Sequence, residues 1–209
     1  MNILTFLIGF AILIYSIILH EIAHGYVADR LGDPTARMRG RLTLNPIPHI
    51  DLLMSIVLPF LLIFTSSPVV FGAAKPVPID PFNFRDPRKD MGITGLAGPL
   101  TNILIAVFFT LIFRFVLPFF PNPTLSAMII STIALNLGLA ALNLIPIPPL
   151  DGSRILAAIL PKEFASLLDS LEQYGLFILF FLLVFPIGGF SLSRFIFSLV
   201  SLWLKWLGF

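Results

Sequence analysis

Six apolar stretches, separated by polar or proline-rich segments, dominate the hydropathy pattern of the 209-residue chain. They cover residues 3–29, 52–64, 92–117, 125–144, 174–187 and 191–207. A helix rises about 1.5 Å per residue, so the first stretch is about 40 Å long and exceeds the roughly 30 Å of a bilayer core. The second is only about 20 Å long, which is short for a span. The pattern predicts an all-α polytopic membrane protein with about five to six membrane-embedded helices.

Two further segments have a different pattern. Residues 68–87 are rich in proline, which opposes helix, so we expect a re-entrant or short extended segment at about 51–80. Residues 154–172 place apolar and charged positions on opposite helix faces, and we expect them to lie at the membrane interface.

The composition excludes several classes of protein. The chain is 57% apolar and only 11% charged, with a mean hydropathy of +1.00, whereas soluble domains are roughly a quarter charged. Its basic residues form no stripe interleaved with aromatic residues, so we expect no nucleic-acid partner. It has no cysteine, which excludes disulfides, thiolate metal sites and cysteine nucleophiles.

The basic residues favour one topology. If the N-terminus is outside and residues 52–64 re-enter, all of the 13 Lys and Arg residues except Arg114 and Arg194 fall on the inside. If residues 52–64 span instead, the later segments invert and the basic cluster at 75–89 moves outside. Segment length and charge bias favour the re-entrant topology.

Two of the three histidines occur in His20-Glu21-Ile22-Ala23-His24, an H-E-x-x-H motif. On a helix, positions i and i+4 share a face, so both imidazoles are placed to bind one Zn²⁺ ion. Glu21 stands beside them and is suited to take a proton from a water molecule at such an ion. Ionisable residues in a membrane-length stretch are costly and indicate a functional site. The alternative, a polar cluster that only joins helices, leaves Glu21 as an expensive extra charge.

A catalytic zinc site has three protein ligands and one open position. Without cysteine, the third ligand must be His, Asp or Glu, and the candidates are His49, Asp51 and Asp151. Prolines break the helix before Asp151, while Gly152 permits close backbone approach. The re-entrant topology places Asp151 on the same side as the histidines, whereas the inverted topology separates them.

Three motifs resemble those of the site-2 protease family of intramembrane zinc metalloproteases. They are His20-Glu21-x-x-His24, Gly98-Pro99-x-x-Asn102 and Asn143-x-x-Pro146-x-Pro148-x-Leu150-Asp151-Gly152. The Lys75-Pro76-Val77-Pro78 stretch is similar to the compact, short-chain branch, for which we expect neither a PDZ nor a CBS domain. The resemblance covers about residues 8–160. We expect a single integral membrane domain at 1–209, with a catalytic core at about 3–160 and a C-terminal helical hairpin at about 173–207.

The resemblance implies specific residue roles. One Zn²⁺ ion per chain is bound by His20, His24 and Asp151, and Glu21 is the general base and proton shuttle. Asn143 hydrogen-bonds the substrate or the developing oxyanion. Further candidates for substrate binding are Asn102 and Lys75, although Asn102 is equally suited to tying helices together. Asn136, seven residues before Asn143, is expected to join helices.

The implied activity is hydrolysis of peptide bonds in or near transmembrane helices of membrane-protein substrates, as in regulated intramembrane proteolysis. The expected partners are a substrate helix and the lipid bilayer. The expected location is a prokaryotic cell membrane, with the active site nearer the cytoplasmic face. Residues 52–64 and 72–78 either present extended backbone to a substrate strand or shield the site as a plug.

Two other functions use the same residues. A membrane zinc transporter or carrier could use the His and Asp side chains as a transit site, but no inverted repeat is visible in the sequence. A non-catalytic scaffold could bind membrane helices, but the complete ligand set argues against it.

Overall fold

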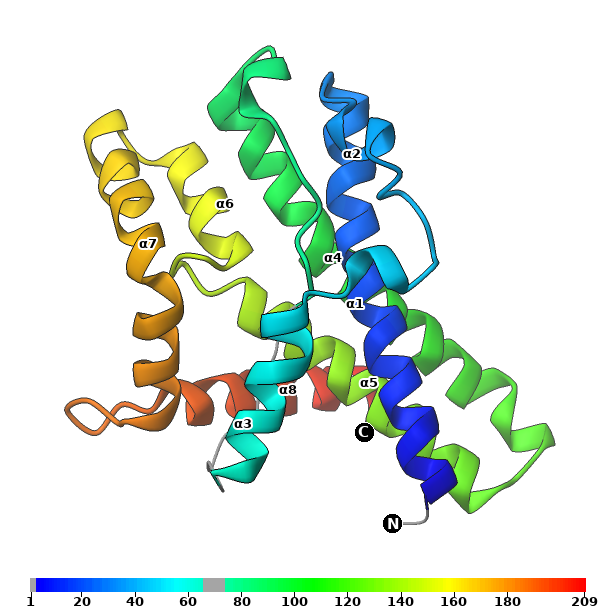
Figure 1. The fold of residues 1–209 in the computed structure, drawn as a ribbon. Helices are drawn as coiled ribbons and strands as arrows, with labels where there is room; N and C mark the ends of the chain where they lie inside the picture. Colours follow the sequence, from blue (N-terminus) through cyan, green and yellow to red (C-terminus); the bar gives the residue numbers. More distant parts are fainter. Residues whose placement is uncertain (1–2, 66–73) are drawn as a thin grey trace.

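A computed structural model describes residues 3–65 and 74–209, and within them the protein is helical with no β-sheet (Figure 1). The long helices are α1 (Ile3–Leu31), α4 (Pro87–Phe115), α5 (Pro123–Asn143), α7 (Lys162–Val184) and α8 (Leu192–Leu207). The short ones are α2 (Thr35–Met38), α3 (Leu58–Phe64) and α6 (Asp151–Ile159). A π-helical segment, Leu52–Val57, precedes α3, and 3₁₀ turns cover Ile47–His49, Pro81–Asn83 and Leu117–Phe119.

Four candidate spans are long and apolar enough to cross a membrane. They are Leu7–Leu31, Pro87–Phe119, Pro123–Asn143 and Lys162–Val184, and only 11% to 39% of their most apolar windows is buried by protein. Their remaining apolar surface suits contact with lipid, so this is an all-α membrane protein. The expected number of five to six membrane-embedded helices is not confirmed. Helix α8 has 16 residues, packs against α5 and lies crosswise to α1 and α7 (Figure 1).

Local signals in the sequence explain where the central helices begin. Asp86 accepts a hydrogen bond from the Lys89 N–H, and Pro87 occupies the first turn of α4. Asn122 does the same for the Leu125 N–H, and Pro123 opens α5. A side-chain oxygen that caps free N–H groups, followed by proline, is a strong helix start.

Helix α4 is the centre of the fold, because it packs against α1, α5 and α6. Two of its glycines let α6 approach closely. A Cβ atom at Gly95 would lie 3.2 Å from the carbonyl oxygen of Asp151, and one at Gly92 would overlap the Ala158 side chain. The small residues at the start of α4 therefore set the position of α6, and with it that of Asp151.

Residues 154–172, which the sequence predicts to be amphipathic and interfacial, are divided between two helices. Helix α6 ends at Ile159, and after the break at Pro161 residues 162–172 form the first half of the membrane-length helix α7. Helix α6 packs against α4, with Ala158 beside Gly92 and Ile155 beside Gly95, while Ile159 is 78% exposed. The amphipathic pattern correctly predicted helix, and the interfacial position stays a prediction, since Phe164, Leu167 and Leu171 on α7 are exposed.

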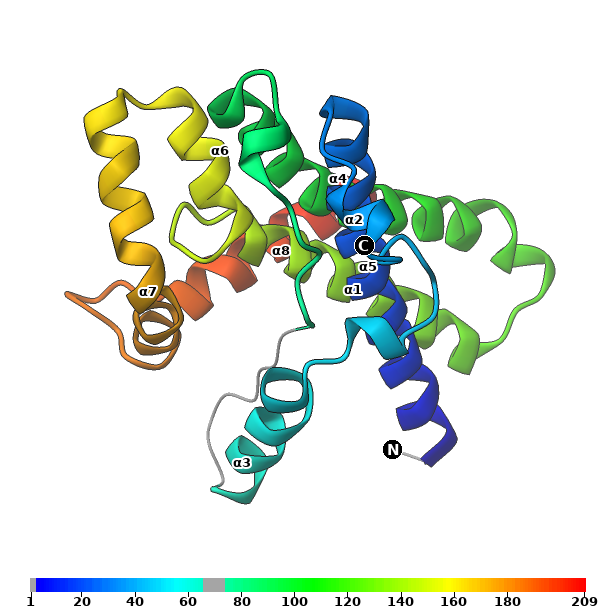
Figure 2. The ribbon, with the colours of Figure 1, turned by 45° about the horizontal axis from the view of Figure 1, so that its top comes forward.

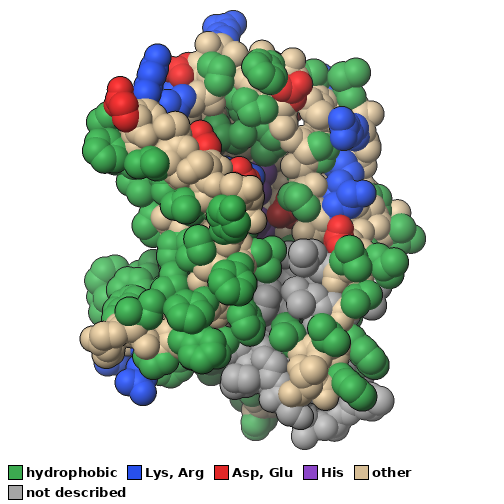
Figure 3. Space-filling view, turned by 60° about the vertical axis from the view of Figure 1, so that its left-hand side comes forward, with side chains coloured by type: hydrophobic (Ala, Val, Ile, Leu, Met, Phe, Trp, Pro, Cys, Tyr) green, Lys and Arg blue, Asp and Glu red, His purple; other side chains and the backbone are tan. Residues whose placement is uncertain are grey.

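The two ends of the molecule differ in charge. The end of α1, the start of α4 and the turn between α6 and α7 lie at one end, and the N-terminus and the turn between α4 and α5 lie at the other (Figure 1). The chain between α1 and α4 thus returns to the end from which it started, in agreement with the re-entrant topology. Helix α3 projects away from the bundle in both ribbon views (Figure 2). Most charged side chains on the face in Figure 3 lie towards the first end.

Candidate metal centre

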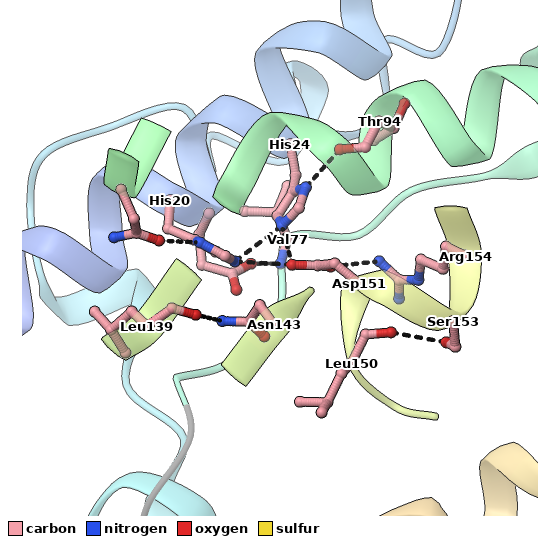
Figure 4. Close-up of polar contacts among 12 residues, drawn as sticks. His20, His24, Val77, Thr94, Leu139, Asn143, Leu150, Asp151, Ser153 and Arg154 are labelled. Carbon is pink, nitrogen blue, oxygen red and sulfur yellow. Dashed lines mark hydrogen bonds and ion pairs between the residues drawn. The ribbon is translucent and has the colours of Figure 1, made fainter. Parts of the chain in front are cut away.

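His20 and His24 lie one turn apart on α1, and Asp151 is the first residue of α6. Their metal-binding atoms form a triangle (Figure 4). His20 Nε2 lies 3.0 Å from His24 Nε2, and Asp151 Oδ2 lies 3.1 and 3.2 Å from these two nitrogens. All three side chains are buried. In the described part of the chain, no other group of three or more His and acidic residues is arranged to hold a metal ion.

The triangle suits one zinc ion. Tetrahedral bonds of about 2.0–2.2 Å place ligand atoms roughly 3.3 Å apart, and the three sides are close to this value. Asp151 Oδ2 is buried without a hydrogen-bond partner among the described residues, as expected of an oxygen that binds an ion. Two imidazoles and one carboxylate leave a fourth position open, as in catalytic zinc sites.

Helix α4 orients both imidazoles from behind. His20 Nδ1 lies 2.6 Å from Asn102 Oδ1, and His24 Nδ1 lies 2.7 Å from the carbonyl oxygen of Thr94. Because both partners are oxygens, each Nδ1 carries the proton and each Nε2 presents its lone pair to the triangle. The neutral imidazoles are thereby preset as metal ligands.

Gly98 on α4 makes room for the two imidazoles. A Cβ atom at this position would lie 2.6 Å from His20 Nε2 and closer still to His24 Nε2. No side chain larger than hydrogen fits there without moving the ligands. The motif residue Gly98 thus has a steric role at the metal centre.

The carboxylate of Glu21 contacts the extended segment 74–78. Glu21 Oε2 accepts a hydrogen bond of 2.8 Å from the Val77 N–H. A carboxylate oxygen held by a backbone N–H fixes the direction of the second oxygen.

The loop before α3 holds this extended segment in place. The Lys75 N–H donates to the His49 carbonyl at 2.9 Å, and Arg41 Nη2 donates to the Lys75 carbonyl at 2.7 Å. Burial lowers the pKa of the Arg41 guanidinium, and the negative charge of Glu21 opposes this shift. Segment 74–78 is therefore fixed beside Glu21 at several backbone atoms.

Sequence comparisons decide the family. Residues 120–186 match the sequence model of Peptidase family M50. Over 189 residues, the chain is 38% identical to "Putative zinc metalloprotease YwhC" of Bacillus subtilis, covering 86% of this chain and 81% of that protein. The chain belongs to Peptidase family M50. It is a zinc metalloprotease, and the ligand triangle accounts for the metal.

Two further relatives of this M50 peptidase come from distant organisms. "Putative zinc metalloprotease Rip2" of Mycolicibacterium smegmatis is 33% identical, with 94% of this chain and 72% of that protein aligned. "Putative zinc metalloprotease MJ0611" of Methanocaldococcus jannaschii is 32% identical, with 71% of this chain and 73% of that protein aligned. No solved structure matches the chain.

The other candidates for the third ligand of the M50 centre lie elsewhere. His49 Nε2 is bonded to the Thr43 carbonyl at 2.9 Å, and Asp51 Oδ1 accepts from the Leu53 N–H at 3.0 Å. Neither residue belongs to the ligand triangle. The structure thus brings Asp151 to the histidines and leaves His49 and Asp51 in the loop before α3.

The three expected substrate-binding residues have different surroundings. Asn143 ends α5 near the triangle (Figure 4), and its Nδ2 donates to the Leu139 carbonyl at 3.0 Å. Lys75 is exposed, with its backbone held as described above. Asn102 is fully buried and bonded to His20. It therefore faces a metal ligand and not the space where a substrate would lie.

Sequence reasoning missed the roles of Arg41, Val77 and Thr94. Thr94 and Val77 act through backbone atoms, which any residue type provides, so their identity carries little signal. Arg41 was counted only as a basic residue that orients the protein in the membrane. An arginine four residues before Asn45-Pro46 gives no sign in the sequence that its side chain becomes buried.

Proposed function

We propose that this M50 peptidase is an intramembrane endopeptidase that hydrolyses peptide bonds in or near transmembrane helices of membrane-protein substrates, in regulated intramembrane proteolysis. The observation that carries the proposal is the place of the metal centre. Its two histidines lie inside the candidate span Leu7–Leu31. Histidine side chains are visible at the bottom of a recess, near the boundary between the charged end and the apolar remainder (Figure 3). A substrate that reaches this depth is itself in the membrane.

The proposed chemistry assigns proton transfer to Glu21. When bound, zinc supplies a Lewis acid that polarises the scissile carbonyl and makes a water molecule more acidic. Glu21, oriented by the Val77 N–H, takes a proton from the attacking water and later delivers it to the leaving amine.

Asn143 is the proposed donor to the substrate carbonyl. Its Nδ2 carries two hydrogens, and the bond to Leu139 uses one of them. The second hydrogen is suited to the oxygen that becomes negative during hydrolysis. In a buried site, one such donor contributes about 10²–10³-fold in rate.

Segment 74–78 is the proposed docking strand for the substrate. A helical substrate must unfold locally before cleavage, because its backbone amides are bonded and covered. The N–H groups of Lys75 and Val77 are already used, and Pro76 and Pro78 have none. The segment therefore offers its carbonyl oxygens to the N–H groups of an extended substrate, although that of Lys75 already accepts a hydrogen bond from Arg41.

We also propose that the enzyme resides in a prokaryotic cell membrane with the site opening towards the cytoplasm. The basis is the positive-inside rule, since the loops that carry most Lys and Arg residues share one end of the fold.

One experiment tests the activity. The purified chain is reconstituted in liposomes with a model single-span substrate, with and without a zinc chelator. We expect cleavage that stops with chelator and in Glu21→Gln, while Glu21→Gln still binds zinc. The matched control is Glu163→Gln, an exposed glutamate at the start of α7, which should cleave normally. Wild-type turnover by Glu21→Gln would contradict the proposed base, and zinc flux without cleavage would indicate a transporter.

A further inference from the structure

A buried chain of side-chain amides extends from α5 to the back of His20. Asn102 Nδ2 donates to Asn136 Oδ1 at 3.0 Å. Asn136 Nδ2 donates to Ser16 Oγ at 3.1 Å and to the Thr132 carbonyl at 2.9 Å. Asn102 and Asn136 are 0% exposed, so water does not compete for these bonds. The chain connects α1, α4 and α5 behind the metal centre.

The Asn102 amide alone does not determine which tautomer His20 adopts. Its oxygen end and its NH₂ end are nearly the same size, and either fits beside an imidazole. With the oxygen towards His20, Nδ1 carries the proton and Nε2 is free to bind metal. With the NH₂ group towards His20, the proton moves to Nε2, and the imidazole no longer binds zinc.

The Thr132 carbonyl removes this ambiguity, because a carbonyl only accepts. The NH₂ group of Asn136 must face it, so the Asn136 oxygen faces Asn102. The NH₂ group of Asn102 must then face Asn136, which leaves the Asn102 oxygen for His20. We infer that Asn136 is a positioning residue, which selects the metal-binding tautomer of His20 by fixing the orientation of Asn102.

His24 provides an internal comparison. Its Nδ1 bonds directly to the Thr94 carbonyl, so its tautomer needs no side-chain relay. Loss of the Asn136 amide should thus affect His20 and leave His24 unchanged. A role limited to joining helices, which the sequence suggests for Asn136, predicts no such difference.

The first test is zinc affinity of the purified full chain, measured by competition with a chelator. We expect Asn136→Leu to bind zinc about tenfold more weakly, at the low end of the range for residues that support metal ligands. Ser16→Ala should change the affinity little, because the Thr132 carbonyl still orients Asn136. The matched control is Thr132→Val, which is equally buried, keeps the carbonyl and removes only a hydroxyl bonded to Met128. It should retain wild-type affinity.

The second test observes the tautomer directly. The chain has only three histidines, so ¹⁵N-histidine NMR of zinc-free protein, at a pH where they are neutral, resolves each ring. We expect Asn136→Leu to shift His20 towards the Nε2–H form while His24 stays unchanged. If Asn136→Leu does not fold, Asn136→Ala removes the same amide.

The third test is rescue through Asn102. In Asn102→Asp both carboxylate oxygens accept, so the orientation of this residue no longer matters. In the Asn102→Asp background, Asn136→Leu should therefore lower the zinc affinity by much less than the tenfold expected in the wild-type chain. A folded Asn136 variant with wild-type affinity and an unchanged His20 tautomer overturns the inference. Unchanged zinc binding in His20→Ala would instead refute the metal site, so the two failures are distinguishable.

Discussion

Gly98 determines whether the two histidines and a metal ion fit against α4. A methyl group there would occupy the space of both imidazole Nε2 atoms, so Gly98→Ala must displace at least one ligand. We expect zinc binding and proteolysis to be lost while the protein remains helical. Metal analysis and circular dichroism of purified protein check this. Gly138→Ala on α5, where a Cβ would meet nothing within 4 Å, is the matched control and should keep both properties.

Asp33 makes the stability of the loop after α1 depend on pH. It is fully buried and accepts hydrogen bonds of 2.8 Å from the Asp80 N–H and from Asn83 Nδ2. Burial raises the pKa of Asp33, but bonds from Thr35, Asp80 and Asn83 outweigh this effect, so its pKa lies below the usual value.

A carboxyl group with a lowered folded-state pKa stabilises the fold above its unfolded pKa of about 3.9, and this contribution is lost as the pH falls through the folded value. Asp33→Asn should therefore unfold at lower temperature than wild type near pH 7, and the difference should shrink below about pH 4. Thermal unfolding across this range measures it. Asp169→Asn, at an exposed position on α7, should show no such pH-dependent difference. A constant difference for Asp33→Asn at every pH would refute the assignment.

The sequence predicted the positions of site residues best where the residues lie close together along the chain. His20 and His24 are placed together by helix periodicity alone. Asn102 was a candidate for substrate binding or for joining helices, and the second is confirmed, because it bonds to His20 on α1 and to Asn136 on α5. Its role depends on which face α4 turns towards α1, and one sequence does not contain that information. Asn136 joins helices as expected, through Ser16 on α1 and Asn102 on α4.

Among the elements, segment 74–78 depends on an arginine from another part of the chain. Arg41 is 8% exposed and donates to the Lys75 carbonyl, and this segment orients Glu21 through Val77. Arg41→Gln should leave zinc affinity unchanged but lower kcat/KM by tenfold or more, because a misplacement of about 1 Å can cost about 10²-fold. Steady-state kinetics and zinc titration of one preparation check this. Arg39→Gln, at an exposed position in the same loop, should behave as wild type, and an equal loss in both variants would contradict the role of Arg41.

The sequence predicted the positions of the helices more reliably than the surfaces against which these helices pack. The membrane-length helices α1, α4 and α5 follow from apolar length, and their starts follow from Asp86, Asn122 and the prolines after them. The amphipathic period of residues 154–172 predicted helix, but a period does not reveal what covers the apolar face, and α6 packs against α4. The glycines of α4 carried that information, since their spacing matches the close approach of α6.

For the whole molecule, the basic loops and the fold together specify an orientation. The end of α1 and the start of α4 lie at one end, and the turn between α4 and α5 lies at the other. Because the chain has no cysteine, Arg85→Cys and Phe119→Cys each introduce a unique thiol, one at each end. In intact cells, a membrane-impermeant thiol reagent should label Phe119→Cys and not Arg85→Cys, since the positive-inside rule places residue 85 in the cytoplasm. Permeabilised cells should label both, and the unmodified chain supplies the blank. Labelling of both thiols from outside would contradict a membrane crossing of α4, which lies between residues 85 and 119. Labelling of only residue 85 would refute the proposed orientation of α4 and favour the alternative in which residues 52–64 span the membrane and the basic cluster at 75–89 lies outside.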